Sequence, residues 1–237
     1  MITVIREDRR YNQKFSSNFI EGKGLFSSSA TYDPENQHFG EIFSFGDYCC
    51  SPGYGISMHP HELFEVVCIQ LSGKMHFVDM LGNDRVTEEG SVHHFSASTG
   101  YSHSVSVVGD NPMRYLSIWI APKRESLVPS YQQKSFGKSV FPLDSMRMLF
   151  TDVDRPVSGV LPIVSNVRIY AGSADTKTFE CYMEDKTIGL LYVTEGTLIV
   201  NDINLNSCDH IRVANEKKLD IKGTPGARFV FVLMPDQ

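Results

Sequence analysis

One supersecondary plan occurs twice in this sequence. Residues 68–95, CIQLSGKMHFVDMLGNDRVTEEGSVHHF, and residues 190–213, LLYVTEGTLIVNDINLNSCDHIRV, each read as an apolar strand, a glycine, an alternating strand, a turn and a further strand. Such a unit cannot bury its apolar face alone, so its repetition predicts two similar β domains. Residues 121–139, APKRESLVPSYQQKSFGKS, contain proline and serine and read as the connection. We therefore predict one domain at residues 1–125 and a second at residues 126–237.

Strands dominate the rest of the chain as well. Alternate residues of the segment YLSIWIA fall on two faces, with Leu116, Ile118 and Ile120 on one and Tyr115, Ser117 and Trp119 on the other. This period of two is typical of a strand, and LGND and VNDI supply turn residues between such runs. The one predicted helix is PLDSMRMLF, with Asp144 or Ser145 as its cap. The expected fold class is all-β.

Composition restricts the partners. The chain has 237 residues, 41% hydrophobic and 21% charged, with a formal net charge of -6, as in an ordinary globular protein. A negative balance argues against nucleic-acid contact, which needs clustered lysine and arginine. The first residues, MITVIREDRRYNQKF, are charged where a signal peptide is apolar, and no window is long enough to span a membrane. We expect a cytoplasmic protein without membrane or direct nucleic-acid partners.

Five cysteines fit a reducing compartment, because they form no CxxC pair and no even disulfide framework: Cys49, Cys50, Cys68, Cys181 and Cys208. The adjacent Cys49 and Cys50 leave two readings open, ordinary thiols or a redox switch. Metal-binding cysteines usually occur in spaced sets. We therefore predict that these two are not metal ligands.

Two histidines, His59 and His61, flank a proline in the segment MHPHELFEVV. Residues two apart in a strand point to the same side, roughly 6.5–7 Å apart along the chain, so both imidazoles can converge on one ion. Neutral imidazole is a common ligand for Fe, Zn, Cu and Ni. Three ligands with open positions suit a catalytic or substrate-binding ion. The alternative is a solvated turn, and the two residues alone leave both readings open.

The surrounding motifs resemble those of the cupin superfamily. The first motif is a glycine, five residues, His-x-His, a short gap, a glutamate and a glycine, matched here by Gly53, His59, His61, Glu65 and Gly73. The second motif places a histidine after a glycine. Here Gly90 is followed by SVHHFSASTGYSH, which ends at His103.

More narrowly, the chain resembles the pirin family of two-cupin proteins. The segments that carry the resemblance are MHPHELFEVVCIQLSGKMHFVDMLGN, GYSHS, YLSIWIAP and PSYQQKSF, and they lie between residues 24 and 140. The resemblance implies a bicupin of two antiparallel β-barrel domains of the jelly-roll type, the double-stranded β-helix. It also implies a mononuclear metal site in the first domain only.

The resemblance further implies which residues hold the metal. Pirins hold iron with the two histidines of HPH, the later histidine and a glutamate two residues after it. In this chain that glutamate is replaced by Val105, so the implied ligands are His59, His61 and His103. Glu65 is a candidate replacement, because other cupins use the glutamate of the first motif as a ligand.

Some pirins open the ring of flavonols such as quercetin with oxygen, so the resemblance implies a metal-dependent dioxygenase acting on a small aromatic molecule. We assign no catalytic residue, since the carboxylate that would take the flavonol proton is the missing one. The alternative is a non-catalytic, metal-poor protein that binds, senses or regulates through a protein partner. Val105 favours this alternative, and the three histidines favour metal binding.

The other histidines are weaker candidates. His93 and His94 are consecutive, so they point to opposite faces of a strand, and we expect one exposed and one packed side chain. His76 lies either in the pocket or in solvent, and His38 and His210 receive no role. The second repeat has FECYMEDKTIG where the first has its ligands, so that half is expected to be structural.

Overall fold

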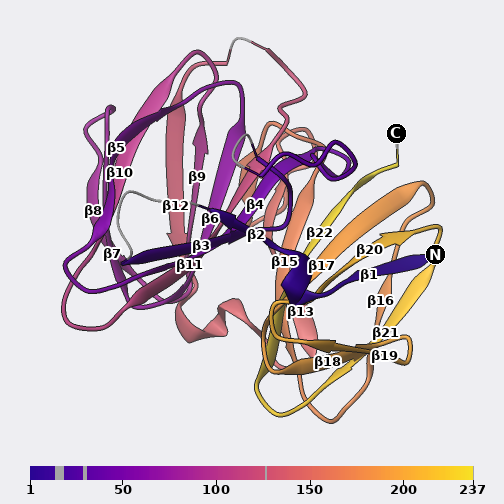
Figure 1. The fold of residues 1–237 in the computed structure, drawn as a ribbon. Helices are drawn as coiled ribbons and strands as arrows, with labels where there is room; N and C mark the ends of the chain where they lie inside the picture. Colours follow the sequence, from indigo (N-terminus) through magenta and orange to yellow (C-terminus); the bar gives the residue numbers. More distant parts are fainter. Residues whose placement is uncertain (14–18, 29–30, 126, 237) are drawn as a thin grey trace. The chain divides into compact units, whose positions relative to one another are not determined.

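The structure is a computed structural model that describes residues 1–13, 19–28, 31–125 and 127–236 (Figure 1). The chain divides into two compact units, neither of which is one continuous stretch. The N-terminal unit comprises Arg10–Lys138 and Ile163–Ser165. The C-terminal unit comprises Met1–Arg9, Ser139–Pro162 and Asn166–Gln237.

The N-terminal unit contains two sheets. In spatial order, the larger one consists of β12 (Ser130–Ser135), β9 (Ser91–Ser96), β6 (Glu65–Ser72), β11 (Met113–Ile120), β4 (Ile42–Cys50), β3 (Ile20–Gly24) and β2 (Tyr11–Gln13). The smaller one consists of β5 (Gly55–His61), β10 (Tyr101–Val107), β7 (Lys74–Asp79) and β8 (Asp84–Glu88).

The C-terminal unit is built in the same way. Its larger sheet consists of β1 (Ile2–Ile5), β20 (His210–Ala214), β17 (Thr187–Glu195), β22 (Ala227–Pro235), β15 (Arg168–Ala174), β13 (Ser145–Asp152) and β14 (Leu161–Ile163). Its smaller sheet consists of β16 (Phe179–Tyr182), β21 (Lys218–Gly223), β18 (Thr197–Val200) and β19 (Ile203–Asn206). In the described part of the chain the helical segments are the short 3-10 turns η1 (Glu7–Arg9) and η2 (Gly137–Val140).

The strand orders of the two units correspond. The central strands run β9–β6–β11–β4 in one unit and β20–β17–β22–β15 in the other, and β5–β10–β7–β8 matches β16–β21–β18–β19. This agrees with the repeat read from the sequence, and the all-β prediction is confirmed. Each unit is a jelly-roll-like pair of sheets and not a closed barrel, which corrects the barrel description.

The unit boundary falls at Lys138 and not near residue 125. The reason is strand pairing. Residues after 125 form β12, which pairs with β9 and so stays with the N-terminal unit. In the equivalent place beside β20, the C-terminal unit uses β1, which comes from the start of the described chain (Figure 1).

The helix predicted for residues 142–150 is wrong. Ser145–Asp152 is strand β13, which pairs antiparallel with β15. Asp144 adopts a left-handed backbone with φ 48, and its Oδ1 accepts a hydrogen bond from the backbone N–H of Asp175 at 2.8 Å. Asp144 therefore shapes a turn instead of capping a helix. Pairing with β15 outweighs the helix propensity of the two methionines in this segment.

Alternation along the strands defines an interior face in the N-terminal unit. On β10, Tyr101, His103, Val105 and Val107 are buried, and the residues between them are partly exposed. The buried apolar cluster draws on both sheets and includes Val66, Cys68, Met75, Phe77, Phe95, Tyr115 and their neighbours. The candidate metal ligand on β10 therefore faces a packed interior. Among the described residues, no helix has the length and apolar character needed to cross a membrane.

Candidate metal centre

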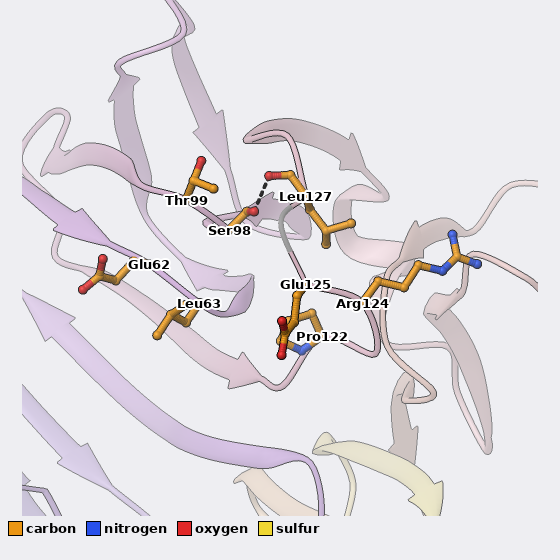
Figure 2. Close-up of a pocket in the computed structure, with 8 residues that line it drawn as sticks. All are labelled: Glu62, Leu63, Ser98, Thr99, Pro122, Arg124, Glu125 and Leu127. Atoms are coloured by element: carbon orange, nitrogen blue, oxygen red, sulfur yellow. Dashed lines mark hydrogen bonds between the residues drawn. The ribbon is translucent and has the colours of Figure 1, made fainter.

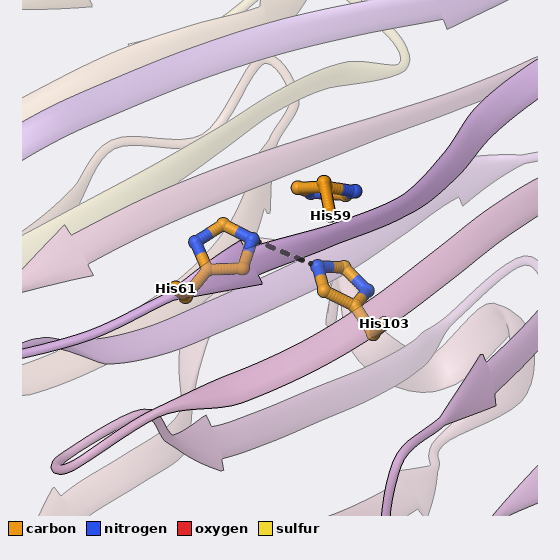
Figure 3. Close-up of side chains that lie close together, drawn as sticks. All are labelled: His59, His61 and His103. Carbon is orange, nitrogen blue, oxygen red and sulfur yellow. Dashed lines mark hydrogen bonds between the residues drawn. The ribbon is translucent and has the colours of Figure 1, made fainter.

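Three histidines converge on one point of the N-terminal unit. His59 and His61 lie on β5, and His103 lies on β10 directly opposite His59 in the antiparallel ladder. Their candidate ligand atoms all lie within 4.8 Å of one another (Figure 3). The β pleat accounts for this, because it puts His59 and His61 on one side of their strand. The structure thus brings together the three histidines singled out in the sequence.

The spacing of the nitrogens fits a metal ion. Nε2 of His61 lies 3.0 Å from Nε2 of His103. Two imidazoles bound to one ion at about 2.0–2.1 Å, at right angles to each other, place their nitrogens about 3.0 Å apart. His59 adds a third nitrogen whose tautomer is set, because its Nδ1–H donates to the carbonyl oxygen of Ser57 at 2.8 Å. His59 therefore presents Nε2 as its ligand atom.

Burial keeps two of the three imidazoles neutral. It lowers the pKa of His61 to about 4, with a further contribution from His59. Burial also lowers the pKa of His103 to about 2, and the neighbouring His59, His61 and His93 add to this effect. A neutral imidazole has the lone pair that a metal ion needs. The Nδ1 atoms of His61 and His103 have no hydrogen-bond partner among the described residues.

Aromatic rings surround the cluster. The ring of Trp119 lies 4.9 Å from that of His61 at a steep angle, and Phe95 lies 5.3 Å from His61 and 4.8 Å from His103. Phe77 stacks on His103 at 5.2 Å. Such walls exclude water, which strengthens electrostatic interactions inside the site. The sequence placed Trp119 on the mixed face of its strand but gave no sign of this contact.

Val105 replaces the missing carboxylate with a packed apolar side chain. It lies on the same inward-facing side of β10 as His103, two residues further along. Only 3% of it is exposed, and it belongs to the interior apolar cluster. It pairs with Phe77 on β7 and, after a register shift, with Ile56 on β5. The position faces the site, and its side chain offers no ligand atom.

Glu65 does not join the cluster. Val66 and Cys68 on β6 point into the interior, so the pleat turns Glu65 to the opposite face of the sheet. Its buried carboxylate accepts hydrogen bonds from Nε2 of His94 at 2.6 Å and from the backbone N–H of Val164 at 3.2 Å. Burial alone would raise the pKa of Glu65, but the bond from His94 holds that pKa below its usual value. Glu65 therefore has a structural role in place of the one suggested by the cupin motif.

His93 and His94 point to opposite faces of β9, as predicted, but both are buried, so the expectation of one exposed side chain is wrong. Nδ1 of His94 accepts a hydrogen bond from Nε2 of Gln132 at 2.9 Å, and Nε2–H of His94 donates to the carboxylate of Glu65. His93 faces the interior, where burial lowers its pKa to about 4. His76 bonds to Asp84 at 2.8 Å and is partly exposed.

The C-terminal unit has no equivalent cluster among its described residues. Strands β16 and β21 occupy the places of β5 and β10, and they pair Phe179 with Ile221 and Cys181 with Leu219. Cys181, Leu219 and Ile221 are buried in an apolar core. His210 of this unit, given no role, is fully buried on β20.

A cavity of about 390 Å³ lies next to the segments that carry the ligands (Figure 2). Its lining includes Glu62 and Leu63, which directly follow His61, and Ser98 and Thr99, which precede β10. Leu63 and Ser98 both have left-handed backbones, with φ 69 and φ 36, and the N–H of Leu63 donates to the carbonyl oxygen of Ser98 at 2.9 Å. Strain of this kind is often held where a ligand binds.

The five cysteines are free thiols. Cys49 is exposed and Cys50 is buried, and burial raises the pKa of both, that of Cys50 to about 11. Neither joins the group of converging ligand atoms found among the described residues. A thiol with a raised pKa is a poor nucleophile and a poor ligand. Their placement favours the reading of ordinary thiols.

Comparisons with known proteins cover both units. The family model described as Pirin matches residues 6–120. A pirin-like protein of Caulobacter vibrioides is 28% identical over 222 residues, which is 90% of this chain and 92% of that protein.

Two crystal structures show the same fold. Bacterial pirin YhhW from Escherichia coli, in complex with nickel(II), matches with a TM-score of 0.90 at 20% identity and covers 100% of both chains. Quercetin 2,3-dioxygenase from Acinetobacter baumannii matches with a TM-score of 0.78 at 18% identity, covering 99% of this chain and 86% of that one.

Proposed function

Over residues 6–120 this chain belongs to the pirin family, and from that premise we propose that His59, His61 and His103 hold one divalent metal ion, iron in the first place. The observation that carries the proposal is the convergence of three ring nitrogens within 4.8 Å. The buried, neutral state of two of the rings supports it. Nickel is the competing ion, because YhhW was crystallised with nickel(II).

We further propose that this centre oxidises flavonol-like aromatic molecules with oxygen. When bound, the ion supplies Lewis acidity and, if it is iron, redox chemistry. The chain itself supplies the surroundings. Trp119, which is partly exposed, presents a flat apolar surface beside His61, which suits a planar aromatic ring. His59 is only partly buried and leaves one side of the cluster open to a ligand.

The test is metal analysis and oxygen uptake on protein purified without an affinity tag or chelator. We expect a single ion per chain, iron above nickel, and oxygen consumption that depends on quercetin. His61→Ala removes one of three ligands and is expected to abolish both. Protein that binds no metal after loading with iron or nickel would overturn the proposal.

One observation favours a second function. Val105 has no ligand atom and Glu65 binds His94 instead, so the converging ligand atoms of the described residues include no carboxylate. Flavonol oxidation needs a proton acceptor. The alternative is a non-catalytic protein that holds its metal weakly and acts through a protein partner. Metal binding without quercetin-dependent oxygen uptake, in wild type and in Val105→Glu, would favour this alternative.

A further inference from the structure

A buried polar network crosses the interior of the N-terminal unit beside the candidate ligands. His93 Nδ1 lies 2.7 Å from the hydroxyl of Tyr131, and its Nε2 lies 3.1 Å from Oγ1 of Thr87. Thr87 in turn donates to Oε1 of Gln70 at 2.8 Å. His93 and Thr87 are buried, with 1% and 3% exposed. Neither the metal site nor the proposed reaction accounts for this network.

The network defines the tautomer of His93. Gln70 uses its Nε2 to donate to the carbonyl oxygens of Gly73 and Thr87, so its Oε1 is the atom that faces the Thr87 hydroxyl. That hydroxyl donates to Gln70, so its oxygen accepts from Nε2–H of His93. The remaining nitrogen, Nδ1, therefore carries a lone pair directed at the hydroxyl of Tyr131. The phenol of Tyr131 donates a hydrogen bond to this neutral imidazole at 2.7 Å, and Oε1 of Gln133, at 3.4 Å, is the longer, competing acceptor.

The same phenol is connected to the candidate metal ligands by stacked rings. Tyr131 stacks on Phe77 at 4.8 Å with 20° between the planes. Phe77 stacks on His103 at 5.2 Å with 30° between the planes. A row of three rings thus leads from the metal ligand His103 to Tyr131, which is itself partly exposed.

We propose that Tyr131 is a redox-active side chain, the terminal electron donor of the N-terminal unit, with His93 as its proton acceptor. The physical reason is acidity, because an oxidised phenol is a far stronger acid than an imidazolium and loses its proton to a base that is already hydrogen-bonded to it. Nδ1 of His93 receives that proton along an existing hydrogen bond. The electron passes through Phe77 towards His103.

The step balances as follows. Tyr131 loses one electron to a one-electron oxidant. A redox-active metal ion held by the three histidines would serve as that oxidant after oxygen, the co-substrate of the proposed function, has taken one electron from its divalent form. The phenolic O–H bond breaks, and an N–H bond forms at Nδ1 of His93. The products are a neutral phenoxyl radical, an imidazolium whose Nε2–H still donates to Thr87, and the reduced oxidant. Only the identity of the natural oxidant rests on the proposed function.

The experiment replaces that oxidant with a probe, so that it does not depend on the metal. The metal-free 237-residue chain is illuminated with tris(bipyridine)ruthenium and persulfate, which generates a ruthenium(III) one-electron oxidant. Electron paramagnetic resonance after freeze-quenching detects the radical. Spin trapping followed by peptide mass spectrometry locates it among the 10 tyrosines and the single tryptophan.

We expect the trapped radical on Tyr131 and loss of its signal in Tyr131→Phe, which keeps the ring stack. The matched control is Tyr182→Phe, at an exposed tyrosine of the C-terminal unit that bonds to Glu180, and it retains the signal. Oxidation of Tyr131 is also expected to be slower in D2O and slower in His93→Gln. A tyrosine that loses its proton to solvent would also be slower in D2O but would be unaffected by His93→Gln, so the variant is the measurement that discriminates.

A signal that survives Tyr131→Phe, or adducts found on Trp119 or on surface tyrosines instead, would overturn the proposal. The location of the adduct in wild-type protein decides the matter even if a variant fails to fold. Protein that binds no metal but is oxidised at Tyr131 would refute the proposed function and leave this inference standing.

Discussion

Nε2 of His61 and Nε2 of His103 face each other at 3.0 Å, although 42 positions separate the two residues in the chain. In the metal-free protein only one of the two nitrogens carries the hydrogen between them, since both rings are neutral. A metal ion would replace that hydrogen and use both lone pairs. Replacing either histidine of this pair is therefore expected to reduce metal binding.

His61→Ala is expected to reduce the metal content of the purified protein to background, because two imidazoles remain where three converged. Elemental analysis of tag-free protein measures this. The control is His76→Ala, whose histidine is partly exposed on β7 and pairs with Asp84, and it keeps the wild-type metal content. Equal metal in the two variants would contradict the three-histidine site.

Val105→Glu is expected to raise metal affinity and to lower the stability of the metal-free protein. The new carboxylate would lie on the inward face of β10 beside His103, in an apolar cluster where an unpaired charge is unfavourable. Calorimetric metal titration and chemical denaturation measure the two effects. Val105→Gln is the matched variant. It should destabilise the fold but should not gain affinity, and a gain equal to that of Val105→Glu would show that charge is irrelevant.

Glu65→Ala is expected to lower the free energy of unfolding by about 3–5 kcal/mol, as for loss of one partner of a buried pair. It leaves His94 and the N–H of Val164 without their acceptor. Glu65→Gln keeps an acceptor oxygen and should cost less. Neither variant is expected to change the metal content, because Glu65 faces away from the cluster. Loss of metal from both well-folded variants would place Glu65 in the site after all.

The pH dependence of stability should carry the signature of His93. Burial lowers its pKa from 6.5 to about 4, so between these values the unfolded chain binds a proton that the folded chain does not. Stability therefore falls as the pH decreases through this window, by about 3 kcal/mol at most for this one group. Urea denaturation of metal-free His93→Gln should show a shallower slope there than wild type, and coinciding slopes would refute it.

Trp119 should report metal binding directly. It is the single tryptophan of the chain, and its ring lies 4.9 Å from that of His61. A paramagnetic divalent ion at the cluster is expected to quench its fluorescence in a saturable titration with nickel(II). The same titration of His61→Ala should show no saturable quenching. Identical curves for the two proteins would mean that the ion binds elsewhere.

The sequence was sufficient to predict the strands, the repeat and the placement of two histidines on one side of β5, because period-two alternation is a local property. The sequence did not show to which face of β6 the side chain of Glu65 points. Val66, Val67, Cys68 and Ile69 form an unbroken apolar run that is buried on both faces, so alternation does not mark the interior. Segment 142–150 was misread because its strand depends on pairing with β15, which is more than 15 residues away along the chain. Contacts of this range have no local signal.

Strand β1 also orders events in time. It pairs with β20, so a ribosome releases it about two hundred residues before the strand that will hold it. Until then its hydrogen-bonding edge has no native partner, while β6, β9 and β12 of the N-terminal unit can already join. If the N-terminal unit folds during synthesis, β1 therefore stays unpaired while that unit forms. The larger sheet of the C-terminal unit is complete only when β1 pairs with β20. Completion of the larger sheet of the C-terminal unit therefore depends on a four-residue strand made about two hundred residues earlier.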